Sequence, residues 1–211
     1  PFYIYYSMFG FQRIGDLAWA AGDMCARGFM IGGTAGRTTL NGEGLQHQDG
    51  HSHIQAGLIP NCESYDPTFA YELAVIIHHG LKDMYVENKN KFYYITVMNE
   101  NYSHPSIPEG SEEGILKGMY CFKRSSLKKP QAYVQLLGGG TILREVEKAA
   151  EILENEYKIA ANIWSVTSFN ELRREGLAIE RENRLHPDQK AKKSYVTLSL
   201  ENETGPVIAA T

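Results

Sequence analysis

The densest group of residues suited to chemistry lies in one glycine-rich stretch, residues 42–53. Three imidazoles and two carboxylates fall within it. Imidazole titrates near neutral pH, and a carboxylate such as Glu43 can orient it or relay a proton. The flanking glycines let the backbone approach a ligand closely. The pattern indicates acid–base and charge-stabilising chemistry on a polar loop.

Two other interpretations of this stretch stay open. His51 and His53 would point the same way on an extended segment, and neutral imidazoles suit zinc, iron or copper. The glycines, however, break any helix that could align His47 with His51. The stretch could also be a hydrogen-bonded loop that lines a domain interface. Spacing alone does not separate this structural role from the catalytic one.

A second candidate region, residues 7–13, lies where a strand is expected to end and a helix to begin. Ligands of open α/β folds bind at this carboxyl edge of a parallel sheet. Phe9 could stack on a flat heterocycle, and Arg13 could meet an anionic group. The alternative is that Phe9 is a core aromatic residue and Arg13 a surface cation.

A third candidate is the glycine-rich segment 138–141 between an expected strand and helix. It resembles a phosphate-binding turn at a helix N-terminus. It lacks both the G-x-G-x-x-G spacing and a P-loop lysine, so a tight turn followed by a helix cap explains it more simply.

Strands and helices alternate along the chain, which predicts a mostly parallel sheet with helices on both faces, an α/β fold. Asp66 is expected to cap a helix with Pro67 at its first position, and Thr141 to cap another. The Ser-, Lys- and Pro-rich segment 124–130 predicts a linker, so the expected domains are residues 1–125 and 126–211. The expected strands are 2–7, 91–98, 133–137 and 162–166, with a short apolar segment at 29–31, and the expected helices are 11–27, 68–85 and 142–157.

Composition excludes several classes of protein. The 211 residues are 43% hydrophobic and 22% charged, with a net charge of −4 and no basic stripe, which argues against nucleic-acid binding. No apolar run is long enough to span a bilayer, and no leader is evident, so we expect a cytoplasmic protein without a membrane anchor. Three cysteines without paired spacing favour neither disulfides nor a zinc knuckle. The aromatic strand at the first residues suggests a piece of a longer polypeptide.

Long motifs match a known family. The sequence resembles the homodimeric, acetyl-transferring pyruvate dehydrogenase of bacteria in segments spread over the whole chain: residues 5–16, 32–47, 49–55, 99–102 and 167–169. The resemblance implies a transketolase-like fold, made here of the later part of the pyrimidine-binding domain and the opening part of the C-terminal domain. It also implies thiamine diphosphate and magnesium as cofactors, with the thiamine diphosphate supplying the electron sink for pyruvate decarboxylation.

The resemblance also implies roles for individual residues. Phe9 is expected to stack on the aminopyrimidine, and Tyr6 to border the same pocket. Arg13, Glu43 and His47 are expected to be catalytic, with His47 assisting at the pyruvate-derived intermediate and in reductive acetylation of the lipoyl group. The implied partners are pyruvate, the lipoyl domain of dihydrolipoyl acetyltransferase and a second subunit. No metal ligand is assigned.

The chain departs from the family pattern in two respects. The Gly-Asp-Gly motif that holds magnesium and the diphosphate is absent, as is the glutamate expected upstream of the first aromatic strand. We therefore expect the chain alone to be inactive. The alternatives are another thiamine-diphosphate enzyme, such as a transketolase or a different 2-oxo acid dehydrogenase, a metal-binding or interaction module, and a purely structural fragment.

Overall fold

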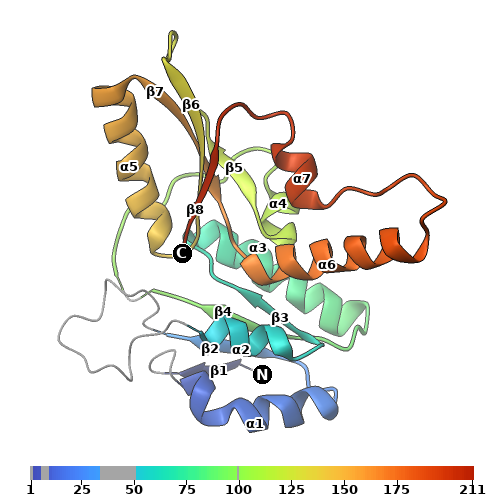
Figure 1. The fold of residues 1–211 in the computed structure, drawn as a ribbon. Helices are drawn as coiled ribbons and strands as arrows, with labels where there is room; N and C mark the ends of the chain where they lie inside the picture. The colour runs from blue at the N-terminus through green and yellow to red at the C-terminus, as the bar shows by residue number, and fades with distance from the viewer. Residues whose placement is uncertain (1, 6–9, 34–50, 99) are drawn as a thin grey trace.

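The computed structural model describes residues 2–5, 10–33, 51–98 and 100–211. Within them the chain forms two four-stranded sheets with helices on both faces of each (Figure 1). All strand pairs are parallel except β5 with β7. The predicted α/β fold with mostly parallel strands and helices on both faces is thus confirmed.

The first sheet has the strand order β1-β2-β4-β3. Its elements are β1 (Phe2–Tyr5), α1 (Gly10–Asp23), β2 (Phe29–Gly32), α2 (Ser52–Leu58), β3 (Cys62–Tyr65), α3 (Ala70–Leu81), the π-helix η2 (Lys82–Val86) and β4 (Phe92–Thr96). Alternate residues of β4 face opposite sides, as the period of a strand requires. Phe92 and Tyr94 pack under α1 and α2, whereas Tyr93 and Ile95 pack against α3.

The second sheet has the order β5-β7-β6-β8. Its elements are α4 (Glu112–Lys117), β5 (Tyr120–Lys123), β6 (Ala132–Gly138), α5 (Ile142–Tyr157), β7 (Ile159–Ser165), α6 (Phe169–Leu185), α7 (Tyr195–Leu200) and β8 (Val207–Ala210). Helix α5 covers one face through Leu143 and Val146. Leu172 of α6 packs on the other face with Trp164.

The structure refines the expected division of the chain. β5 precedes the expected boundary at residue 125/126 but pairs with β7 of the second sheet. The chain therefore passes from one sheet to the other between β4 and β5. The domain limits 1–125 and 126–211 stay a prediction, and segment 124–130 is a connection inside the second sheet rather than between the two.

A buried glutamate joins the two sheets. Glu72 of α3 is fully buried and accepts hydrogen bonds from the Tyr120 hydroxyl of β5 and the Ser165 hydroxyl of β7, both at 2.6 Å. Its second carboxylate oxygen accepts the backbone N–H groups of Thr68 at 2.6 Å and Phe69 at 2.9 Å. We call each sheet with the helices that cover it a unit. Because the donors come from both units, the Glu72 carboxylate fixes how the two sheets pack against each other.

One local expectation is wrong, and a second is confirmed in position only. Asp66 does not cap α3, which begins at Ala70 with Phe69 at the N-cap position. The Asp66 carboxylate instead accepts the Thr96 hydroxyl, and its backbone N–H donates to Thr167 O at 2.7 Å. Thr141 does occupy the N-cap position of α5, but its side chain makes no capping hydrogen bond.

Candidate functional site

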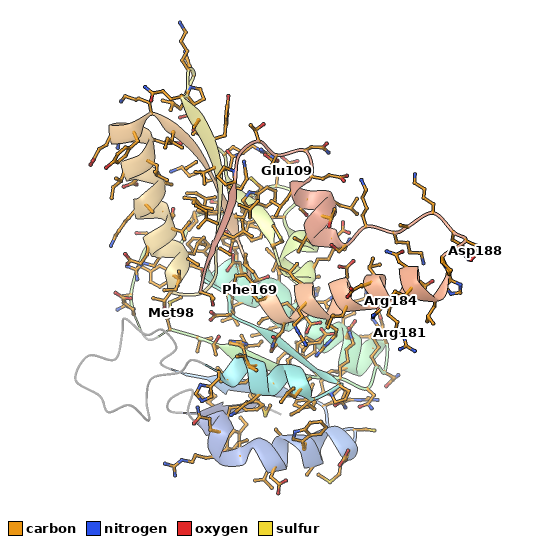
Figure 2. All side chains as sticks on the ribbon, viewed as in Figure 1. Met98, Glu109, Phe169, Arg181, Arg184 and Asp188 are labelled. Carbon is orange, nitrogen blue, oxygen red and sulfur yellow. The ribbon has the colours of Figure 1, made fainter. Side chains whose placement is uncertain are left out.

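The strands that precede the candidate segments end at one edge, the carboxyl edge of the first sheet. The candidate segments follow parallel strands in sequence: residues 6–9 follow β1 and residues 34–50 follow β2. Parallel strands end at the same edge of a sheet, which is where open α/β folds bind ligands. Figure 2 labels Met98, just beyond β4, and Phe169, at the start of α6, on the side of this edge. The same figure places Arg181 and Arg184 at the far end of α6 and Asp188 just beyond it.

The structure describes only part of the expected site. Tyr6, Phe9, Glu43 and His47 lie outside the described residues. Arg13 lies on α1, where it is exposed. Next to it in sequence, Gln12 Nε2 lies 2.7 Å from His51 Nε2. The structure thus brings α1 and the end of the histidine-rich stretch together at one edge.

His53 is not part of an extended segment, as the metal-site interpretation assumed. It lies in α2, which begins at Ser52, directly after His51 at the N-cap position. A helix turns successive side chains about 100° apart, so His51 and His53 do not share a face. No group of three or more potential metal ligands occurs among the described residues.

Hydrogen bonds link four residues, which we call the edge cluster: His53, Thr96, Asp66 and Asn170. His53 Nε2 lies 2.9 Å from Thr96 Oγ1, and the Thr96 hydroxyl donates to Asp66 Oδ1 at 2.5 Å. Asn170 of α6 donates to the backbone carbonyl of His53 and to Ser64 Oγ. The His53 ring also packs on Tyr94, with centroids 5.2 Å apart.

The glycine-rich turn 138–141 closes on this cluster. Gly140 has a φ of +50°, and its N–H donates to Asp66 O at 3.1 Å. A Cβ at Gly140 would come within 2.3 Å of the Asp66 carboxylate. The space beside this turn therefore holds a carboxylate, which repels phosphate. The structure supports the tight turn and gives no support to the phosphate-binding alternative.

Sequence reasoning missed Thr96, Asp66 and Asn170 as site residues. They are far apart in sequence, on β4, after β3 and on α6. The available signal was weak: polar residues at the ends of expected parallel strands, of which Thr96 is one. Asn170 carried no recognisable signal, because its role depends on how the second unit packs against the first.

A second polar region, the ionic cluster, lies at the opposite, amino edge of the first sheet: Glu63, Asp83, Lys89 and Lys91. Asp83 is fully buried and pairs with Lys89 at 2.8 Å and with Lys91 at 3.3 Å, and Lys91 also pairs with Glu63. Burial opposes ionisation of Asp83, but the hydrogen bond from Lys89 and the charges of His79 and Lys91 hold its pKa below the usual range.

A cleft of about 420 Å³ beside the ionic cluster reaches α6 and α7. Glu171 of α6 lines it together with Glu63 and Lys91. Burial raises the pKa of Glu171 to about 7, with Arg174 opposing the shift and Glu63 adding to it. The acidic and basic side chains of this region pair mostly with one another. We therefore assign the cleft and the ionic cluster a structural role, in the packing of the two units.

In the described part of the chain, no helix is both long and apolar enough to cross a membrane.

Comparisons with known proteins agree with these observations. Residues 1–105 match the family model of the pyruvate dehydrogenase E1 component middle domain, and residues 118–211 match the transketolase-like C-terminal domain. The chain is 67% identical over 211 residues to the pyruvate dehydrogenase E1 component of Pseudomonas aeruginosa, covering 100% of the chain and 24% of that relative. It is 59% identical to the Escherichia coli K12 protein of the same name, covering 100% of the chain and 23% of the relative.

Solved structures share the fold. A transketolase from Campylobacter jejuni superimposes with a TM-score of 0.66 at 16% identity, covering 100% of the chain and 31% of that structure. A split-gene transketolase, described as an inactive tetramer of four beta chains, superimposes with a TM-score of 0.58 at 15% identity, covering 99% of the chain and 65% of that structure. At these identities the likeness shows the fold alone. The chain spans about a quarter of the length of the curated relatives it matches.

Proposed function

We propose that this chain, which belongs to the bacterial pyruvate dehydrogenase E1 family, supplies the aminopyrimidine side of a thiamine-diphosphate site. In the whole enzyme this site decarboxylates pyruvate and passes the acetyl group to the lipoyl group of dihydrolipoyl acetyltransferase. The observation that carries the proposal is that the strands preceding the candidate segments are parallel and end at one edge, in a chain 67% identical to an E1 component. The proposal includes a homodimeric enzyme in the cytoplasm.

The residues of this chain fit one half of the cofactor. The carboxyl edge offers imidazole, guanidinium, carboxamide and hydroxyl groups, and the segment after β1 contributes Tyr6 and Phe9. These groups suit a flat, hydrogen-bonding heterocycle. The Gly-Asp-Gly motif that is expected to hold the magnesium diphosphate is absent from the sequence. We propose that the metal ligands belong to a part of the enzyme outside these residues.

Each proposed residue has a separate task. When bound, thiamine diphosphate supplies the electron sink that accepts the electrons left by decarboxylation. Phe9 stacks on the aminopyrimidine ring, and Tyr6 borders it. Glu43 and His47 hold and move protons at the reacting centre, and Arg13 stabilises negative charge.

A chimeric enzyme tests this proposal. The corresponding 211 residues of the Pseudomonas aeruginosa relative are replaced by this chain, and thiamine diphosphate binding with magnesium and pyruvate decarboxylation are measured. We expect binding and turnover close to those of the relative. Phe9→Ala should weaken cofactor binding, whereas His47→Asn should lower kcat by about a hundredfold while binding persists.

Two results would refute these assignments. A Phe9→Ala chimera that binds the cofactor as the parent does would exclude stacking. A His47→Asn chimera with unchanged kcat would remove His47 from the chemistry. Arg173→Ala, on the exposed face of α6, serves as the surface control and should change neither quantity.

A further inference from the structure

The edge cluster determines which nitrogen of His53 carries a proton. The Asp66 carboxylate can only accept a hydrogen bond, so the Thr96 hydroxyl donates its proton across the 2.5 Å contact to Oδ1. The hydroxyl has only this one proton. At the second contact, 2.9 Å from His53 Nε2, Thr96 Oγ1 must therefore accept a hydrogen bond from the ring N–H. His53 therefore carries a proton on Nε2, and in the neutral ring the lone pair is on Nδ1.

The surroundings hold this arrangement in place. Thr96 is 1% exposed, at the end of β4. The Asp66 backbone is held on both sides by the second unit, through Thr167 O and Gly140 N–H. Gly140 has no side chain, which leaves room for the Asp66 carboxylate.

The second unit also fixes the backbone of His53. Asn170 Nδ2 donates both to His53 O and to Ser64 Oγ, so one side chain of α6 ties α2 to β3. A Cβ at Gly57, one turn further along α2, would come within 2.9 Å of the Asn170 amide. The close approach of α2 to α6 therefore depends on a glycine at this position.

We infer that Thr96 and Asp66 are positioning residues that fix His53 as an Nε2–H imidazole at the carboxyl edge and favour its uptake of a proton at Nδ1. The inference rests on the proposed function for its catalytic meaning. In the series His53–Thr96–Asp66, the Thr96 hydroxyl accepts a hydrogen bond from the imidazole and donates one to the negatively charged Asp66 carboxylate. A carboxylate in this position stabilises the imidazolium form and orients the ring.

Three variants in the chimeric enzyme separate this role from a purely structural one. Thr96→Val removes the hydroxyl at nearly constant shape, and Thr96→Ser restores it. Thr68→Val is the matched control: Thr68 is also buried at the interface, but its hydroxyl donates to Gly140 O, at 2.8 Å, rather than contacting His53 Nε2 as Thr96 does.

The first measurement does not depend on turnover. Exchange of the His53 ring C2–H with solvent deuterium, followed by mass spectrometry as a function of pH, reports the midpoint of protonation of this one histidine. We expect a lower midpoint in Thr96→Val, recovery in Thr96→Ser and no change in Thr68→Val. An unchanged midpoint in Thr96→Val, or an equal shift in Thr68→Val, would overturn the inference.

The second measurement is the steady-state rate of pyruvate decarboxylation. Thr96→Val should lower kcat by about tenfold with little change in KM, Thr96→Ser should recover most of it, and Thr68→Val should stay within about twofold. A shifted His53 midpoint with an unchanged kcat would overturn the catalytic part of the inference. A chimera that never turns over would instead contradict the proposed function, and the exchange data would still decide the state of His53.

Discussion

The two edges of the first sheet carry polar clusters of different character. At the amino edge, the ionic cluster pairs two carboxylates with two lysines, so its positive and negative charges largely neutralise one another. At the carboxyl edge, the edge cluster holds the Asp66 carboxylate through a hydroxyl that leads to an imidazole. Within the described residues Asp66 forms no ion pair. A self-neutralised cluster stabilises the fold, whereas a charge directed at an imidazole is suited to proton chemistry.

The largest expected effect tests the structural role of the ionic cluster. Asp83→Asn should lower the free energy of unfolding by about 3 kcal/mol, because it leaves two lysines beside a neutral buried group. The pKa of Asp83 is lowered in the folded state, so its contribution is present above the unfolded pKa and is lost as pH falls through the folded value. Urea unfolding at several pH values should therefore show the deficit at neutral pH and its disappearance in acid.

The neighbouring Glu87 provides the control for Asp83. Glu87 is exposed, and Glu87→Gln should leave the free energy of unfolding unchanged within experimental error. In the chimera, Asp83→Asn should leave the His53 protonation midpoint unchanged. A shift of that midpoint would show that the two edges are coupled and would break the comparison.

A smaller effect concerns Glu171, between the ionic cluster and α6. Its pKa is raised to about 7, so it favours the folded state when protonated. That stability is fully present below the unfolded pKa and is lost as pH rises through about 7. We expect unfolding free energy to fall by about 2 kcal/mol between about pH 5 and 8 from this group.

Glu171→Gln isolates that contribution. The variant should flatten the pH dependence of unfolding in this window, as measured by denaturant titration. A profile as steep as that of the parent would assign the slope to another group.

The smallest expected effect on stability sharpens the comparison at the carboxyl edge. Asn170→Ala removes two hydrogen bonds and should cost about 1 kcal/mol of unfolding free energy. Because it releases the His53 backbone, it should also lower kcat of the chimera. Asn183→Ala is a matched control at the far end of the same helix, where the side chain makes two hydrogen bonds with the backbone of Lys192. Equal effects of the two substitutions on kcat would show that Asn170 has no special role.

Local periodicity predicted some regular elements of this chain and left others out. Helix α5 has the predicted bounds, residues 142–157, because its apolar residues recur at helical spacing between a glycine turn and the left-handed Lys158. Strand β4 was also expected, as an apolar and aromatic run. The elements that were not predicted are α2, β3, α4, β5, α6, α7 and β8. In β3 the apolar pattern is broken by Glu63 and Ser64, which are buried polar residues whose partners come from distant segments.

The edge cluster could not be predicted from the sequence for the same reason. Asp66 followed by Pro67 has the local pattern of a helix cap. In the structure, however, the polar groups of Asp66 form hydrogen bonds with Thr96, Thr167 and Gly140 instead of with the helix. These partners lie 30 to 101 residues away in sequence, as their numbers show. The proposed roles of residues within segments 6–9 and 34–50 came from the resemblance to a family. Local sequence patterns alone did not assign these roles.

The most direct test of the account is pyruvate-dependent release of carbon dioxide by two preparations with magnesium, thiamine diphosphate and an artificial electron acceptor. One is the 211-residue chain alone, and the other is the chimeric E1 polypeptide that contains it. The account predicts turnover by the chimera and none by the chain, because the chain supplies one side of the site. Turnover by the chain alone, or a folded chimera that binds the cofactor but releases no carbon dioxide, would contradict it.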